Sequence, residues 1–276
     1  MPFKTLQKVI VNELRLSNCG FDHDTVDSFV RSQWQSKAKN AYYLIYRWLV
    51  AVVLVATVII SLYSHLQESS FSLFFIYLTR WGIILNMIVG ILGAVLVTNW
   101  HIGYHETILY NKKTPTSFKI YWALHNIALV SAFVITIVYW TILHDSKKGL
   151  TLAGVMSHAM NSVIMFIDIL IAAYPMRLYH VIQPICFGTC FAVFSYIYHL
   201  CGGVNQQGEH FIYPVLNWAT PKKALTYFAA INVLLIIVHT VLFCIYKLRV
   251  FIQRKLFITK FAIPQTMDLN CSITVD

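Results

Sequence analysis

The chain has 276 residues, of which 58% are hydrophobic and only 12% are charged, whereas an average soluble domain has roughly 45–50% and about 25%. This composition excludes an ordinary soluble domain and indicates that a lipid bilayer surrounds most of the chain. The formal net charge of +10 does not indicate a nucleic-acid partner, because the basic residues stand beside apolar stretches and in the tails, where membrane orientation explains them.

Residues 1–40 are polar and contain no apolar run of signal-peptide length, so the first apolar span is expected to insert itself and stay. A helix needs about 20 apolar residues to cross the hydrocarbon layer. Six stretches qualify, at residues 41–64, 71–98, 119–143, 150–174, 180–201 and 223–247. The sequence therefore predicts an all-α polytopic protein with an N-terminal tail (1–40), one six-helix transmembrane domain (41–247) and a C-terminal tail (248–276).

The Lys and Arg residues divide unequally between the two sides of the predicted bundle. Fifteen lie in the tails and in the connections on the same side as the tails, four lie in the connections on the other side, and Arg47 and Arg80 lie within spans. The positive-inside rule therefore predicts that both termini are cytoplasmic. The same orientation predicts that the glycosylation sequon at Asn270 stays unused.

The fourth span carries several polar side chains, and such groups usually face the interior of the bundle or a water-filled cavity. His158, Asn161, Met165 and Asp168 follow one another at spacings of 3, 4 and 3 residues. This spacing places them on one stripe of a helix. We therefore expect the stripe to face inward.

The second span contributes a polar pair, Thr79 and Arg80, to the predicted outer half of the bundle. Both residues lie about nine residues into a span that crosses in the same direction as the fourth, so they are expected at the depth of His158 and Asn161. His199, near the outer end of the fifth span, could join them. This outer group is the first candidate site for binding a lipid or fatty acid inside the bundle.

A second group of polar residues is expected nearer the cytoplasmic side. Arg47, His125, Asn126, Asp168 and His239 fall at comparable depth, and an ion pair between Arg47 and Asp168 would reduce the free energy of burying either charge. Two alternatives stay open from the sequence. These groups could only fix helix packing through hydrogen bonds, and Arg47 could extend its charge to the interface without a partner.

Small residues in the second span indicate a place where helices approach closely. Gly90 and Gly93 lie next to Ala94 in this span. Close packing against a neighbouring helix is the first interpretation, and dimerisation through a small-residue face is the second.

No motif of a soluble enzyme is present. The sequence has no glycine-rich phosphate loop, no His-Glu-x-x-His and no Gly-x-Ser-x-Gly. It also has no cysteine spacing typical of a zinc site. We predict no metal and no cofactor, and an enzyme of this sequence would have to work inside the bilayer.

Several short runs resemble the rolling stone family of insect membrane proteins. They are Tyr46–Leu49, Ser157–Ser162, Pro184–Cys186, Tyr196–His199 and Gly208–Trp218, and the resemblance extends from about residue 32 to about residue 249. It implies a multi-pass protein of the plasma membrane with a developmental role in myoblast fusion, and no enzymatic activity. It implies no particular protein partner.

A more distant likeness joins the chain to the androgen-induced and androgen-dependent membrane hydrolases, which cleave fatty-acid esters with an intramembrane threonine and histidine. Thr79 is similar to their threonine. The position of their histidine is occupied by Asn161, whose carboxamide cannot take a proton from a hydroxyl nucleophile. The likeness therefore implies an alternative in which Thr79 is the nucleophile and His158 the base. Without turnover, Arg80, Asn161 and His199 would remain binding residues.

Overall fold

The computed structural model describes residues 13, 15–104, 113–144, 149 and 151–261, so Asn270 and the far ends of both tails lie outside the described residues. Within these ranges the chain forms helices and no β-strand. Six helices are long and apolar enough to cross a membrane, at Ala41–Leu66, Leu78–Gly103, Thr116–Leu143, Leu152–Ile171, Leu178–Leu200 and Pro221–Leu256. The prediction of an all-α, six-span membrane protein is confirmed.

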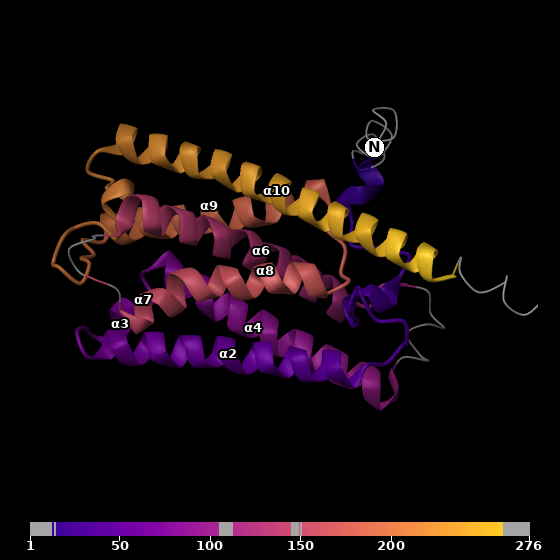
Figure 1. The fold of residues 1–276 in the computed structure, drawn as a ribbon. Coiled ribbons are helices and arrows are strands. Elements are labelled where there is room, and N and C mark those ends of the chain that lie inside the picture. The colour runs from indigo at the N-terminus through magenta and orange to yellow at the C-terminus, as the bar shows by residue number, and fades with distance from the viewer. Residues whose placement is uncertain (1–12, 14, 105–112, 145–148, 150, 262–276) are drawn as a thin grey trace, which may run out of the picture.

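The spans lie side by side as one bundle (Figure 1). They are built on α2 (Ala41–Leu66), α4 (Leu78–Asn99), α6 (Thr116–Val138), α8 (Asn161–Ile171), α9 (Ile182–Leu200) and α10 (Pro221–Phe261), with the short helices α3 (Phe71–Phe74) and α7 (Leu152–Val155). The N-terminal segment and the last turns of α10 lie at one end, here called the tail end. The opposite end carries the connection between α9 and α10 and is called the loop end.

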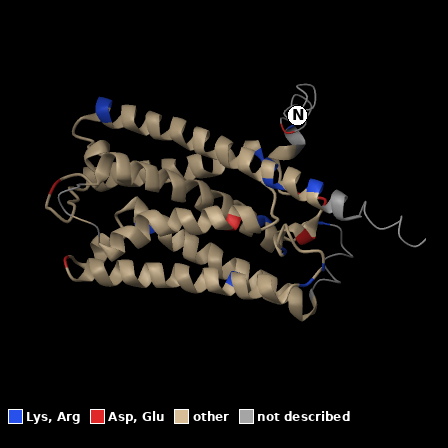
Figure 2. Ribbon diagram, viewed as in Figure 1, with Lys and Arg blue, Asp and Glu red and all other residues tan. Residues whose placement is uncertain are grey.

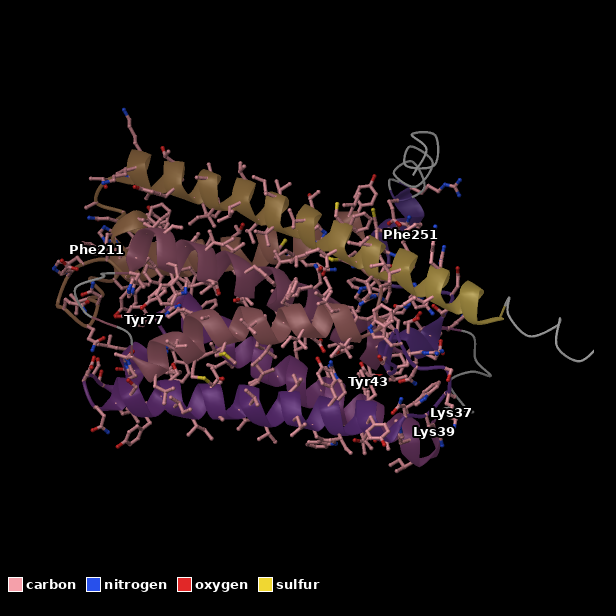
Figure 3. All side chains as sticks on the ribbon, in the orientation of Figure 1. Lys37, Lys39, Tyr43, Tyr77, Phe211 and Phe251 are labelled. Atoms are coloured by element: carbon pink, nitrogen blue, oxygen red, sulfur yellow. The ribbon has the colours of Figure 1, made fainter. Side chains whose placement is uncertain are left out.

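Charged and aromatic residues mark the two ends of the bundle. Figure 2 shows Lys, Arg, Asp and Glu gathered mostly at the ends and sparse along the helices between them. In Figure 3, Lys37, Lys39 and Phe251 lie at the tail end, and Tyr77 and Phe211 lie at the loop end. This distribution is the one that a bilayer around the middle of the bundle requires.

Helix α2 has a defined start and a close neighbour. The side chain of Asn40 accepts hydrogen bonds from two backbone amides of the first turn and caps the helix. The face of α2 then packs on α4, where Gly90 lets the two helices approach. A methyl group at position 90 would lie 2.8 Å from Leu54 Cδ1 and 3.4 Å from Ala51 Cα. Close helix packing at Gly90 is therefore confirmed.

The predicted second span, 71–98, is not one helix. Helix α3 ends at Phe74, the backbone of Tyr77 is extended, and α4 begins at Leu78. Thr79 and Arg80 consequently lie in the first turn of α4, and the prediction that they lie about nine residues along a helix is wrong. Hydropathy could not reveal the break, because the residues that form it are as apolar as the span itself.

The fourth span contains a π-helical turn, η6 (Met156–Met160), between α7 and α8. A π turn inserts an extra residue and so rotates the side chains on either side of it relative to one another. Asn161, Met165 and Asp168 are buried as the predicted inward stripe requires, whereas His158, within the turn, is only half-buried. His158 nevertheless lines a cavity at one end of the bundle, so all four members of the predicted stripe face inward.

The described part of the N-terminal segment packs against the tail end of the bundle. Val26 and Phe29 are buried in the main core together with residues of α6 and α8. Ser32 forms an isolated antiparallel bridge with Ala172, just after α8. The segment therefore closes the tail end of the hydrophobic core.

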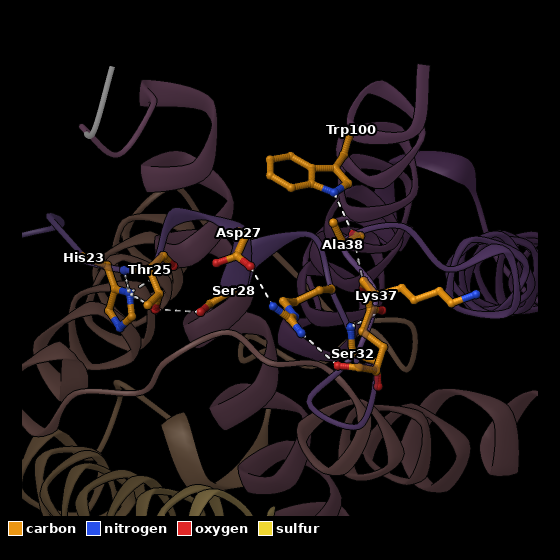
Figure 4. Close-up of polar contacts among 10 residues, drawn as sticks. His23, Thr25, Asp27, Ser28, Ser32, Lys37, Ala38 and Trp100 are labelled. Atoms are coloured by element: carbon orange, nitrogen blue, oxygen red, sulfur yellow. Dashed lines mark hydrogen bonds and ion pairs between the residues drawn. The ribbon is translucent and has the colours of Figure 1, made fainter. Parts of the chain in front are cut away.

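Polar contacts fix the path of this segment into α2 (Figure 4). Arg31 Nη1 donates to Asp27 Oδ2 at 2.7 Å, and Arg31 Nη2 donates to the carbonyl oxygen of Gln35 at 2.8 Å. Trp100 Nε1, at the end of α4, donates to the carbonyl oxygen of Ala38 at 3.0 Å. Residues 27–38 are therefore held by both local and long-range bonds.

Candidate functional site

Five side chains, of which Tyr46 is half-buried and the others are buried, form a polar group in the tail-end half of the bundle. This group is called here the Asp168 cluster and consists of Tyr46 and Arg47 of α2, Tyr121 and His125 of α6, and Asp168 of α8. Arg47 Nη1 and the Tyr46 hydroxyl donate to Asp168 Oδ1 at 2.5 and 2.9 Å. His125 Nε2 lies 2.8 Å from Asp168 Oδ2. Arg47 Nη2 donates to the Tyr121 hydroxyl at 2.5 Å. The cluster thus ties three helices together.

The ion pair expected between Arg47 and Asp168 is confirmed, and the alternative in which Arg47 reaches the interface is wrong. Arg47 is 1% exposed and Asp168 is 2% exposed, so neither charge meets solvent. Removing one member of such a pair leaves an uncompensated buried charge. The cluster lines neither of the two loop-end pockets described below, which favours a structural role over ligand binding.

Gly93 of α4 makes the position of Arg47 possible. A methyl group built on Gly93 would collide with the Arg47 guanidinium, and it would lie 3.1 Å from the Tyr121 hydroxyl. Only a residue without a side chain leaves space for the guanidinium between α2, α4 and α6. The small residue predicted to serve helix packing therefore also accommodates a buried charge.

The remaining members of the predicted inner group lie elsewhere. Asn126 Nδ2 donates to the carbonyl oxygen of His180 and to Gln183 Oε1, both at 2.9 Å. His239 Nε2 lies 3.1 Å from the carbonyl oxygen of Arg177. These contacts hold α6 and α10 to the segment around the start of α9. Asn126 and His239 are therefore not part of the Asp168 cluster, although the sequence predicted them at the same depth.

A cavity of about 320 Å³ opens at the loop end and is called here the loop-end cavity. It brings together three residues that the sequence analysis assigned to one site, Thr79, Arg80 and His158. The other lining residues come from the helix ends and the α9–α10 connection: His65, Tyr77, Tyr139, Leu143, Gln206, Gln207, Tyr213 and Pro214. The wall is therefore mostly polar and aromatic.

The half-buried Arg80 side chain is held among neutral groups. Its Nη1 donates to the hydroxyls of Ser61 and Ser157, the second at 3.4 Å, and the Ser157 hydroxyl donates to Ser61 at 3.1 Å. The guanidinium lies 5.0 Å from the centre of the Phe74 ring. These contacts orient the charge but do not neutralise it.

Thr79 and His158, the nucleophile and the base of the hydrolase alternative, each contact a different tyrosine. Tyr213 is hydrogen-bonded to the side chain and backbone of Thr79; burial raises the pKa of Tyr213, although these bonds act in the other direction. The His158 ring stacks on Tyr139 with 3.4 Å between ring centres, and its Nδ1 is buried without a hydrogen-bond partner. A nucleophile and its base would need to be in hydrogen-bond reach.

Two other predicted binding residues do not line this cavity. Asn161 is 1% exposed and accepts a hydrogen bond from Asn86 Nδ2 at 2.8 Å. His199 lies near the end of α9, where its Nδ1 is 2.8 Å from the carbonyl oxygen of His210. The expectation that His199 lies beside Thr79 and Arg80 is therefore not met.

A smaller apolar pocket of about 60 Å³ adjoins the loop-end cavity. The two share four lining residues, Thr79, Tyr139, Leu143 and Tyr213. The remaining lining comes from aliphatic and aromatic residues of α4, α6, α9, α10 and the connection before α10. The sequence analysis missed Tyr139, because an aromatic residue at a span end is equally typical of an interface anchor. It missed Tyr213 because this residue lies in the connection between α9 and α10, whose fold hydropathy does not predict.

Metal binding has no support within the described ranges, where no group of three His, Cys, Asp or Glu side chains is placed to hold an ion.

The family model for protein rolling stone matches residues 2–266 of the chain. The chain belongs to the rolling stone family. Protein rolling stone of Drosophila melanogaster is 35% identical to it over 256 residues, which cover 90% of this chain and 92% of that relative. The region matched to the rolling stone model includes all six spans. No solved structure matches the chain.

Proposed function

We propose that this rolling stone family member acts in the plasma membrane in the fusion of myoblasts during muscle development, with both termini in the cytoplasm and without catalysing a reaction. The observation that carries the proposal is the match to the rolling stone family over nearly the whole chain. The excess of Lys and Arg beside the tail end supports the orientation.

The loop end supports a role in surface contact. The connection after α9 folds onto the bundle, where Ile212, Val215 and Leu216 are buried, while Gln207, Glu209 and His210 remain exposed. In the proposed orientation these exposed side chains face the neighbouring cell. Because this polar surface is already ordered, it can bind an apposed membrane or protein without the entropy loss of ordering a loop.

The test is a fusion assay in muscle cells that lack the protein. We expect fewer nuclei per muscle fibre, a number that the wild-type chain should restore and the double variant Glu209→Ala, His210→Ala should not. Surface labelling of both proteins controls for expression. Normal fusion in the absence of the protein would refute the proposal.

The second candidate function is hydrolysis of lipid esters inside the membrane. It is supported by one observation, the presence of Thr79, Arg80 and His158 around the same cavity. Thr79 would be the nucleophile and His158 the base that takes its proton. Such a reaction would require Thr79 to exchange its bond to Tyr213 for one to His158.

Labelling with a fluorophosphonate probe separates the two functions. An esterase would be labelled in the wild type and in Thr79→Ser, but not in Thr79→Ala. Thr240→Ala is the matched control, because Thr240 is an exposed threonine of α10 that bonds only within its own helix. Absence of labelling and of ester turnover in folded wild-type protein would eliminate the esterase.

A further inference from the structure

We infer that the loop-end cavity binds the anionic head of an amphiphile, a carboxylate or a phosphate, at the guanidinium of Arg80. Binding requires neither turnover nor a role in cell fusion, so the inference stands or falls separately from both functions above.

The first argument is an uncompensated charge. Among the described carboxylates, none lies within ion-pair distance of Arg80, and its hydrogen-bonded partners are the neutral hydroxyls of Ser61 and Ser157. The Nε atoms of Arg80 and Arg47 are both buried without a hydrogen-bond partner, so the missing carboxylate is what distinguishes Arg80. A cation held inside a span without a counter-charge is unfavourable, and a bound anion would supply that charge.

Arg47 shows how the charge of a buried arginine is compensated in the same bundle. It is paired with Asp168 at 2.5 Å and lines neither loop-end pocket. Arg80, by contrast, lines a cavity of about 320 Å³. The volume beside the unpaired cation is large enough for an oxyanion and several waters, since one water occupies about 30 Å³ in the liquid.

The second argument is the chemistry of the remaining wall. Tyr77, Thr79 and Tyr213 bring hydroxyls to the cavity, and Gln206 and Gln207 bring side-chain amides. These groups can donate hydrogen bonds to the oxygens of a carboxylate or phosphate. No described carboxylate lines the cavity. Glu68 contacts its wall from outside, where Glu68 Oε2 accepts a hydrogen bond from Gln206 Nε2 at 3.3 Å.

The third argument concerns what the anion is attached to. The apolar pocket of about 60 Å³ shares Thr79, Tyr139, Leu143 and Tyr213 with the cavity. An apolar chain carried by the anion could place its first carbons there while its head stays beside Arg80. This polar-to-apolar gradient favours an amphiphile over a free inorganic anion.

The experiment measures binding of radiolabelled oleate, oleoyl lysophosphatidate and oleyl alcohol to the full-length protein in detergent. We expect saturable binding of oleate, lysophosphatidate or both, and much weaker binding of the uncharged alcohol. The tighter of the two acids identifies the head as carboxylate or phosphate. Arg80→Gln should weaken binding about tenfold or more, the usual effect of losing a hydrogen bond to a charged group.

Lys222→Gln is the matched control, because it removes one positive charge from an exposed position at the loop end and lies outside the cavity lining. Gln207→Trp provides a second test should Arg80→Gln fail to fold, since it fills the cavity from an exposed position and should also abolish binding. Equal binding of acids and alcohol, or equal loss in Lys222→Gln and Arg80→Gln, would overturn the inference. So would unchanged binding in Arg80→Gln and Gln207→Trp.

Discussion

Arg47 Nη1 donates to Asp168 Oδ1 at 2.5 Å, joining α2 to α8 between residues 121 positions apart in the chain. Both side chains are almost fully buried, so each charge depends on the other. This one contact therefore makes a sharp prediction about stability.

Asp168→Asn should lower the free energy of unfolding by about 3–5 kcal/mol, because it leaves the Arg47 guanidinium buried without a counter-charge. Thermal unfolding of the purified protein in detergent measures the effect. The double variant Arg47→Met, Asp168→Leu should recover much of the loss, since it removes both charges. An unchanged melting temperature in Asp168→Asn would contradict the role of the pair.

Gly93→Ala should also destabilise the protein, because the added methyl group collides with the Arg47 guanidinium. The expected loss is about 1–3 kcal/mol, as for other overpacked interiors. Gly188→Ala is the control, since a methyl group there would meet Leu235 Cδ1 at an ordinary 3.7 Å. Equal melting temperatures for the two variants would show that the space at Gly93 is not needed.

The packing of the N-terminal segment should weaken in acid. Burial lowers the pKa of His23 from its ordinary value near 6.5, a shift that a hydrogen bond with the Thr25 backbone partly opposes. The pKa of His23 is thus lower in the folded protein than in the unfolded chain. The stability that neutral His23 contributes is therefore complete above its unfolded pKa and is lost as pH falls through its folded pKa. Proteolysis of residues 15–40 should therefore quicken below about pH 6.

His23→Gln isolates this contribution, because glutamine does not titrate in that range. The acid-dependent part of the proteolysis rate should be smaller in the variant. Any acid dependence that comes from other histidines should remain. A wild type and variant with parallel pH profiles would assign the acid sensitivity to another group.

Two native cysteines report the orientation. Cys201 at the loop end and Cys19 at the tail end are both free and exposed. In intact cells, a membrane-impermeant maleimide should label a variant that retains only Cys201, whereas a variant that retains only Cys19 should react after permeabilisation. The reverse pattern would invert the proposed topology.

The sequence predicted the features that depend on the bilayer as a solvent. Six apolar stretches had to become helices, because lipid does not satisfy backbone groups. An ion pair between Arg47 and Asp168 was expected as one of the ways to bury either charge. Thr79, Arg80 and His158 were placed near one another by counting residues along their spans. They do line one cavity, although Thr79 and Arg80 lie at the start of α4.

Other features depend on three-dimensional fit and could not be read from the chain. The break before Leu78 occurs among residues as apolar as the helices around it, and the π turn at Met156–Met160 alters the helical spacing on which the stripe was predicted. His199 bonds a backbone carbonyl of the connection that follows it, a contact that depends on how that connection folds. Burial of Phe29 depends on the shape of the tail end.

Helix α10 has 41 residues, which at 1.5 Å per residue makes a rod of about 60 Å, roughly twice the thickness of the hydrocarbon layer. The sequence analysis ended the last span at Lys247, yet the helix continues unbroken to Phe261. With Lys247 at the headgroups, the rod projects about 20 Å beyond them. A protein that binds its far end would be kept at a set distance from the lipid and would follow any tilt of the bundle.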